Sequence, residues 1–292
     1  MPVPSSLVGY RSDTAVTEVT PRWSMAYAAA LDDFLPCYID TRDAARFIAH
    51  PMFPVCFEWP VIVGMRHEIE RAGVKSHEAI RSVHASHDMV LHRPIRPPER
   101  LATVAEIVAV ERRSAGAYMV TRLDTTAANG EPVCSSWYGS LYRGIELRGD
   151  DRPFVSREPL PTSENSTSAS DSSTAIHVVG GMAHIYTECA QIFNPIHTDA
   201  SVAQAAGLPG IILHGTATLA LAVSRIVAAQ AGNDPSRVMR VAAQFRAMVA
   251  MPSDITLKVK ARARSADGGA IYFDVMNDQG APAISNGVII LR

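Results

Sequence analysis

The sequence predicts an α+β protein built from two tandem units, each a curved antiparallel sheet wrapped around a central helix. Three observations predict it. A polar, serine-rich stretch in the middle of the chain separates two halves of similar size. Each half ends in a glycine-containing turn followed by an apolar strand pattern. The second half also contains a long, almost uncharged run that is typical of a buried helix.

The serine-rich stretch sets the expected domain organisation. Residues 151–175 have the composition of a loop or linker, because they are polar and contain few apolar side chains. We therefore expect one unit at 1–150 and a second at 176–292. The glycine turns at Gly130 and Gly280 each precede the last strand of a unit.

Local patterns place further elements within the units. Residues 83–92 alternate like a strand, and long strands are expected within 92–108 and 245–261. The run 216–229 predicts the buried helix of the second unit. Its counterpart around 60–73 is compatible with either a strand or a buried helix, and periodicity does not decide between them.

Composition excludes several classes of function. The chain has 292 residues, which is enough for two domains, with 47% hydrophobic and 19% charged residues and a net charge of −2. No basic face indicates a nucleic-acid partner. The first fifteen residues show no secretory signal or membrane anchor, so no membrane partner is expected. The four cysteines are widely spaced without C-x-x-C, which is typical of reduced thiols in a cytoplasmic protein.

Two short motifs in the second unit indicate chemistry. The run Asn194-Pro195-Ile196-His197 contains a turn signal that would present an imidazole at a rim, because the residue before proline leaves the α region. Asp199 then suits the N-cap of a short helix. Further on, His214-Gly215 opens the long apolar run. Backbone N–H groups at such a helix start favour an anionic oxygen, such as that of an enolate-like thioester.

These motifs resemble the signature of MaoC-like (R)-specific enoyl-CoA hydratases and dehydratases, which have the hot-dog fold. The matching positions are Tyr186, Asn194, Pro195, His197, Asp199, His214 and Gly215. The resemblance implies a double hot-dog fold, with the active signature in the second unit and room for the acyl tail in the first. It also implies reversible hydration of a trans-2-enoyl-CoA thioester without a cofactor. A homodimer is expected by the same analogy.

The resemblance assigns roles residue by residue. His197 is the expected acid/base, Gly215 N–H polarises the thioester carbonyl, and Asn194 orients water or the imidazole. Tyr186 is expected to pack the acyl group or the histidine, with His214 and Thr216 beside the substrate. From their chemistry alone, Arg93 and Arg246 are candidates for the phosphates of the carrier.

One position departs from the family pattern. The catalytic aspartate stands two residues before the asparagine, and here Ile192 occupies that place. Three possibilities remain open. His197 acts as the only strong acid/base, Glu188 reaches the vacated place from one helical turn back, or hydration is lost. The last leaves a non-catalytic acyl-CoA binding protein or partner subunit, and hot-dog proteins also include thioesterases.

Other chemistries lack support in the sequence. No nucleophile-elbow, dinucleotide-binding or P-loop motif is present. His84, His87 and His92 lie close together, but the first two are expected on opposite faces of a strand, so no metal site is predicted. Asp32 and Asp33 fall near the first-unit position that corresponds to Ile192, and we expect them to be surface or capping residues.

Overall fold

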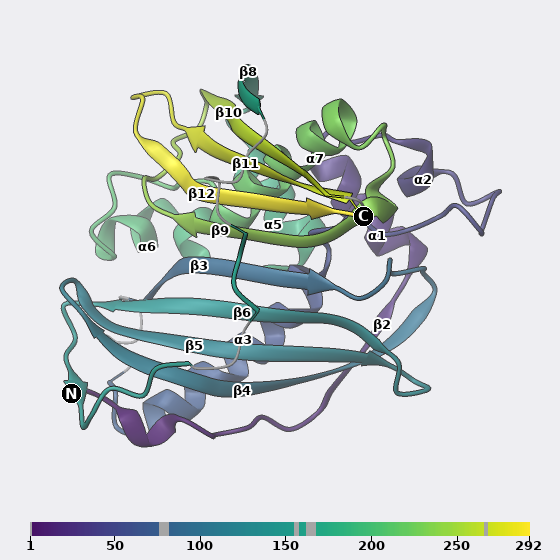
Figure 1. Cartoon of the computed structure of the whole chain (residues 1–292). Coiled ribbons are helices and arrows are strands. Elements are labelled where there is room, and N and C mark those ends of the chain that lie inside the picture. The colour runs from purple at the N-terminus through teal and green to yellow at the C-terminus, as the bar shows by residue number, and fades with distance from the viewer. Residues whose placement is uncertain (1, 76–81, 155–157, 162–167, 266–267) are drawn as a thin grey trace.

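The computed structural model describes residues 2–75, 82–154, 158–161, 168–265 and 268–292 (Figure 1). The N-terminal half comprises β1 (Val3–Pro4), the 3-10 turn η1 (Ser5–Leu7), β2 (Ala15–Val19), α1 (Pro21–Ala30), α2 (Pro36–Ile39), α3 (Pro54–Arg71), β3 (Ser82–Leu91), β4 (Glu99–Arg113), β5 (Gly116–Ala127), β6 (Pro132–Arg143) and β7 (Leu147–Arg148). The C-terminal half comprises β8 (Ser168–Val178), α5 (Met182–Ala190), η3 (Pro195–His197), α6 (Ala200–Ala205), α7 (Gly215–Gln230), η4 (Pro235–Arg237), β9 (Val238–Phe245), β10 (Ser253–Ser265), β11 (Gly268–Met276) and β12 (Pro282–Leu291).

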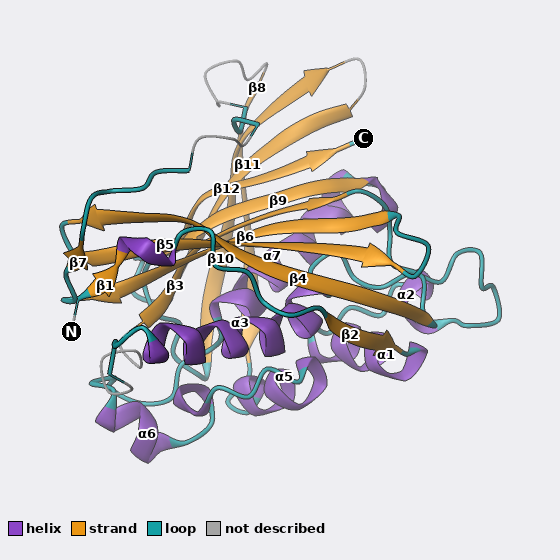
Figure 2. Ribbon diagram, turned by 90° about the horizontal axis from the view of Figure 1, so that it is seen from below, coloured by secondary structure: helices purple, strands orange, loops and turns teal. Residues whose placement is uncertain are grey.

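Ten strands form one continuous sheet in the order β2-β4-β5-β6-β3-β9-β12-β11-β10-β8. The order is symmetric about its centre, since each strand of the first half has a counterpart at the same place in the second. Figure 2 shows α1, α3 and α5 on one side of this curved sheet. The structure therefore confirms the predicted α+β fold, with the two halves of one curved antiparallel sheet wrapped around helices. We call the half from β1 to β7 the first repeat and the half from β8 to β12 the second repeat.

The two repeats join where β3 runs antiparallel to β9, in the middle of the sheet (Figure 1). The register pairs Ser86 with Gln244 and Val90 with Arg240. A buried ion pair supports this seam, because the Arg240 guanidinium donates twice to the Asp88 carboxylate at 2.8 Å. Arg240 also donates to the Glu158 carbonyl at 3.1 Å, which fastens the chain between the repeats to the sheet.

The helices follow their sequence signals to different degrees. The predicted helix 216–229 is α7, extended by one residue at each end. The undecided run 60–73 is helical, and its helix α3 begins earlier, at Pro54. Both Pro54 and Pro60 carry the proline signal of a helix start, but Pro60 lies inside α3. Asp199 caps α6 as expected, accepting from the backbone N–H groups of Ser201 and Val202.

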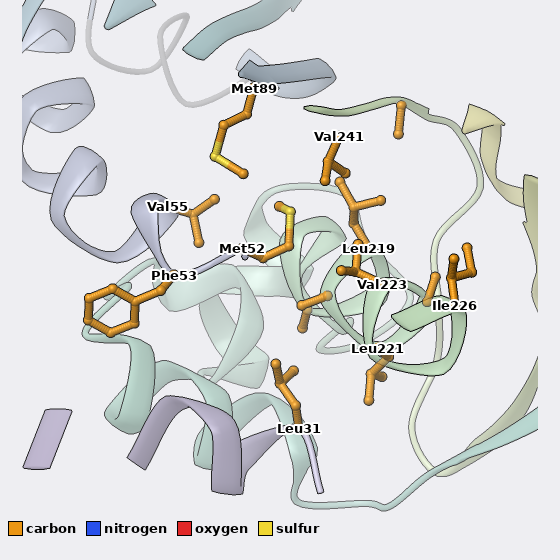
Figure 3. Close-up of a cluster of buried hydrophobic side chains, with 14 of the residues drawn as sticks. Leu31, Met52, Phe53, Val55, Met89, Leu219, Leu221, Val223, Ile226 and Val241 are labelled. Carbon is orange, nitrogen blue, oxygen red and sulfur yellow. The ribbon is translucent and has the colours of Figure 1, made fainter. Parts of the chain in front are cut away.

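One hydrophobic core spans both repeats. Figure 3 shows Met89 of β3, Leu219 of α7 and Val241 of β9 in it, together with Phe53, which directly precedes α3. Each of these four is fully buried. Burying a side chain of this size stabilises the fold by roughly 1.5–3 kcal/mol. This core is shared by both repeats, while a second cluster that includes Val61, Ile107 and Leu123 lies within the first repeat.

The serine-rich segment differs in part from the expectation. A loop was predicted through residue 175, but β8 begins at Ser168 and pairs with β10. β8 is the outermost strand of the sheet, and its residues Ser172, Ser173 and Thr174 are exposed, so this part of the strand does not require an apolar pattern. Residues 155–157 and 162–167 of the predicted linker lie outside the described residues. No helix of the described chain is both long and apolar enough to cross a membrane.

The seam predicts a stability effect. Replacing Arg240 by alanine leaves the buried Asp88 carboxylate without its guanidinium partner, and we expect the free energy of unfolding to fall by about 3–5 kcal/mol. Urea unfolding followed by circular dichroism measures it. The control is Arg42→Ala, which removes an ion pair to Asp40 whose arginine side chain is 90% exposed; its effect should stay below about 1 kcal/mol. Equal effects of the two substitutions would contradict this account.

Candidate active site

The N-terminus of α7 presents backbone donors. The first N–H groups of an α-helix have no intrahelical acceptor, and here they belong to Gly215, Thr216 and Ala217. The ring of Phe245 lies against Gly215, because a Cβ built at residue 215 would stand 2.9 Å from its Cδ1 atom. Only glycine fits at this close approach. The helix start is therefore left open as a site for a partly negative oxygen.

His197 lies at the end of η3, directly after the Asn194-Pro195 turn. Its Nδ1 atom is 2.8 Å from the Ile212 carbonyl oxygen. A carbonyl only accepts, so Nδ1 carries the hydrogen and Nε2 keeps its lone pair. Burial lowers the pKa of His197 to about 4, although the Ile212 carbonyl opposes the shift. The ring is therefore neutral near pH 7 and can act as a base through Nε2.

His214 stacks on His197, with ring centroids 3.7 Å apart. Its Nε2 atom lies 3.2 Å from the Thr187 hydroxyl oxygen, while its buried Nδ1 atom has no hydrogen-bond partner in the described part of the chain. Burial, followed by the neighbouring His197, holds the pKa of His214 well below its usual value. Two stacked imidazoles in a buried position do not both become cations. His214 therefore stays neutral and packs against one face of the His197 ring.

Tyr186 supports the helix start from behind. Its ring is fully buried and lies 5.0 Å from the His214 ring, centroid to centroid. Its hydroxyl donates to Thr216 Oγ1 at 3.2 Å and lies 3.3 Å from the hydroxyl of Tyr27, which comes from the first repeat. Tyr186 therefore does not reach the cavity lining, whereas Thr216 does.

One cavity of about 530 Å³, which we call the site cavity, contains these groups. Among the residues of the predicted signature, it is lined by Asn194, His197, His214, Gly215 and Thr216. Arg246 lines it as well. Its exposed guanidinium donates to Gln244 Oε1 and Ser285 Oγ. The structure does not bring Arg93 to this cavity, because Arg93 pairs with Glu99 and Glu131 elsewhere.

The position of the absent aspartate is apolar. Ile192 is 5% exposed and lines the site cavity. Glu188 is exposed on α5 and does not line it. The expected helical relation between the two residues is wrong, because α5 ends at Ala190 and Gln191 takes a left-handed conformation. Asn194, two residues after Ile192, contributes a polar side chain to the same part of the cavity lining.

Two histidines that were not among the predicted site residues form part of the cavity wall. His84 and His87 both line it, although they were expected on opposite faces of a strand. A β-bulge in β3 between His84 and Ser86 inserts one residue, so the two rings share a face with centroids 5.4 Å apart. In the described residues, no group of three or more His, Cys, Asp or Glu side chains is placed to hold a metal ion.

Two further wall residues gave little signal in the sequence. Glu58 lies on α3 and is 2% exposed, and Tyr138 lies on β6. A buried glutamate is rare and therefore indicates a functional site. The burial of Glu58 could not be predicted, however, because the helix at 54–71 was not assigned from the sequence. Asp33 was expected to be a surface or capping residue. It is 7% exposed, accepts from the Leu35 backbone N–H at 3.4 Å and lies 4.0 Å from His50 Nε2.

The close approach at the helix start predicts the effect of Gly215→Ala. The new methyl group would overlap the Phe245 ring, so we expect the free energy of unfolding to drop by about 1–3 kcal/mol. Thermal unfolding measures it. Gly210→Ala is the control, since a Cβ there meets nothing within 4 Å. Adding Phe245→Leu should recover stability in the Gly215 variant, and a lack of recovery would contradict the proposed overlap.

Comparisons with known proteins agree with this architecture. A model described as MaoC like domain matches residues 164–272, and one described as FAS1-like, dehydratase domain region matches residues 6–136. Enoyl-CoA hydratase ChsH3 of Mycobacterium tuberculosis is 27% identical over 213 residues, which cover 73% of this chain and 69% of that protein.

Solved structures share the fold over almost the full length. A MaoC-like dehydratase from Phytophthora capsici has a TM-score of 0.80 at 19% identity and covers 98% of this chain and 96% of its own. A Mycobacterium tuberculosis protein described as a double hotdog fold has a TM-score of 0.61 at 14% identity, with 97% and 95% covered. The chain thus has the double hot-dog fold, and its residues 164–272 match the MaoC like domain.

Proposed function

We propose that this protein catalyses the reversible hydration of a trans-2-enoyl-CoA thioester. Hydration or dehydration of enoyl-CoA is the activity for which several relatives are named. The observation that carries the proposal is a neutral imidazole with a free Nε2 lone pair in the same cavity as an open helix N-terminus. Base and oxyanion donors are the two groups that addition of water to an unsaturated thioester requires.

The proposed mechanism uses His197 twice. Nε2 takes a proton from water as the water oxygen bonds to the β-carbon of the acyl group. The electrons of the double bond move toward the thioester oxygen, where Gly215 N–H stabilises the developing enolate. His197 then returns the proton to the α-carbon, which restores the carbonyl and the neutral imidazole. One ring on one side of the substrate gives syn addition, and Asn194 holds the water.

Replacing His197 tests the base directly. His197→Gln should reduce kcat/KM for hydration of crotonyl-CoA by about 10²–10⁴-fold, because the general base is lost. The loss of enoyl thioester absorbance measures the rate. His177→Gln is the control, as that histidine is exposed on β8 and pairs with Asp254 outside the cavity lining. Equal rates in wild type and His197→Gln would exclude His197 from the mechanism.

The pKa of His197 predicts the pH profile. The base must be neutral, and its pKa is lowered to about 4 from 6.5. We therefore expect kcat/KM not to fall as pH is reduced through 6.5, and to fall only as pH approaches 4. Since Glu58 also titrates in this cavity, the profile is repeated in Glu58→Gln. A loss of activity centred near 6.5 in both proteins would contradict a desolvated His197.

A second candidate function is acyl-CoA binding without turnover. Ile192 favours it, because a side chain that holds no proton lines the wall where the family pattern has a carboxylate. Calorimetric binding of a saturated acyl-CoA, together with the hydration assay, separates the two functions. Binding with no turnover of any enoyl-CoA would support the second candidate. Release of free thiol, followed with a thiol-reactive dye, would instead indicate thioester hydrolysis.

A further inference from the structure

The site cavity continues beyond the signature into the first repeat. One face of α3 lines it with residues at helical spacing, among them Glu58, Ile62 and Arg66. β3 contributes His84 and His87 to the same wall. A plain alkyl chain would require an apolar wall, because polar groups that lose water to a hydrocarbon stay unpaired. This end of the cavity has apolar lining from Val55, Ile62 and Leu141, but the polar side chains of Glu58, His84 and His87 lie among them.

The two histidines form a packed cluster with Tyr138. The His84 ring stacks on the Tyr138 ring with centroids 3.8 Å apart, and His87 meets His84 edge-on. On its other side His84 touches Phe245, the residue that closes on Gly215. The cluster is therefore continuous with the helix start, and an acyl chain that leaves the thioester site in this direction passes it.

Hydrogen-bonding capacity is left open in this cluster. His87 is 1% exposed, and neither of its ring nitrogens has a partner among the residues that the structure describes. The same holds for the buried Nε2 atom of His84. Burial lowers the pKa of His87 to about 4, so the ring is neutral and offers one donor and one acceptor. A hydroxyl group, which also has one of each, is its natural complement.

Glu58 adds a third open group. Its Oε1 atom accepts from the Ser136 hydroxyl at 2.6 Å. Burial raises the pKa of Glu58 to about 7, with the Ser136 hydrogen bond opposing. A large share of this carboxyl is therefore protonated near neutral pH and can donate a hydrogen bond to a ligand oxygen. The deep wall thus holds neutral polar groups of both kinds.

We propose that His84, His87 and Glu58 form a subsite for an uncharged oxygen function, a hydroxyl or ketone, carried on the acyl chain away from the thioester. The inference rests on the proposed function and specifies its substrate class. A carboxylate fits less well beside Glu58, because two neighbouring carboxyl groups in a buried site do not both ionise without a large free-energy cost. Arg66 lines the same cavity, where its guanidinium covers the Trp59 ring and interacts with Tyr138. A carboxylate-terminated chain therefore has to be included in the test.

The test compares three matched series of 2-enoyl-CoA substrates, whose chains end in a methyl, a hydroxyl or a carboxylate. We expect kcat/KM to be at least about tenfold higher for a hydroxyl-terminated chain than for the methyl-terminated chain of equal length. In His87→Leu this preference should disappear, so that the ratio of kcat/KM between the hydroxyl and methyl series falls to about one. His92→Leu is the control, since that exposed histidine follows the same strand and bonds Ser135 outside the cavity.

Binding measurements separate this proposal from the proposed function. Saturated ω-hydroxyacyl-CoA and acyl-CoA of equal length are titrated calorimetrically into wild type, His197→Gln and His87→Leu. A hydroxyl preference that persists in His197→Gln and is lost in His87→Leu supports the subsite, even if no enoyl-CoA is turned over. Equal affinities in wild type would overturn it. A preference for the carboxylate series would also overturn it and would point to Arg66.

Discussion

The pairing of β3 with β9 is the constraint on which the site depends. Because these strands run antiparallel at the centre of the sheet, the two repeats share one surface and one hydrophobic core. The buried pair of Asp88 and Arg240 crosses the seam and holds its register. A shift of one residue would turn every β3 side chain to the opposite face. His84 and His87 would then lie on the opposite face of the sheet, outside the cavity.

The seam also explains why both repeats contribute to one cavity. His84 of the first repeat touches Phe245 of the second, and Phe245 lies against Gly215. Behind the helix start, the hydroxyls of Tyr27 and Tyr186 meet at 3.3 Å across the same boundary. The donors of α7 are therefore positioned by contacts from both halves of the chain. The first repeat carries no copy of the signature, yet its side chains line the cavity that contains the signature residues.

Signals that act within a few residues were readable in the sequence. Gly215 and Asp199 marked helix starts correctly, because a close approach and a cap each depend on one residue and its neighbours. The bulge in β3 was not readable, since it depends on the register against β6. The start of α3 was not predicted because periodicity did not distinguish a strand from a buried helix in the run 60–73. Fold class and signature followed from local patterns, while the composition of the cavity wall required the tertiary pairing.

The Ile212 carbonyl bears on how a site without the aspartate could work. It accepts from His197 Nδ1 and so fixes the tautomer, which is one task of a carboxylate beside a histidine. A carbonyl carries no full charge, however, and burial already disfavours the cationic ring. An imidazolium formed by taking a proton from water is therefore unstable at this position. Under the proposed mechanism, that instability drives the proton onward to the α-carbon, and since the ring stays on one side of the acyl group, water and proton add to the same face.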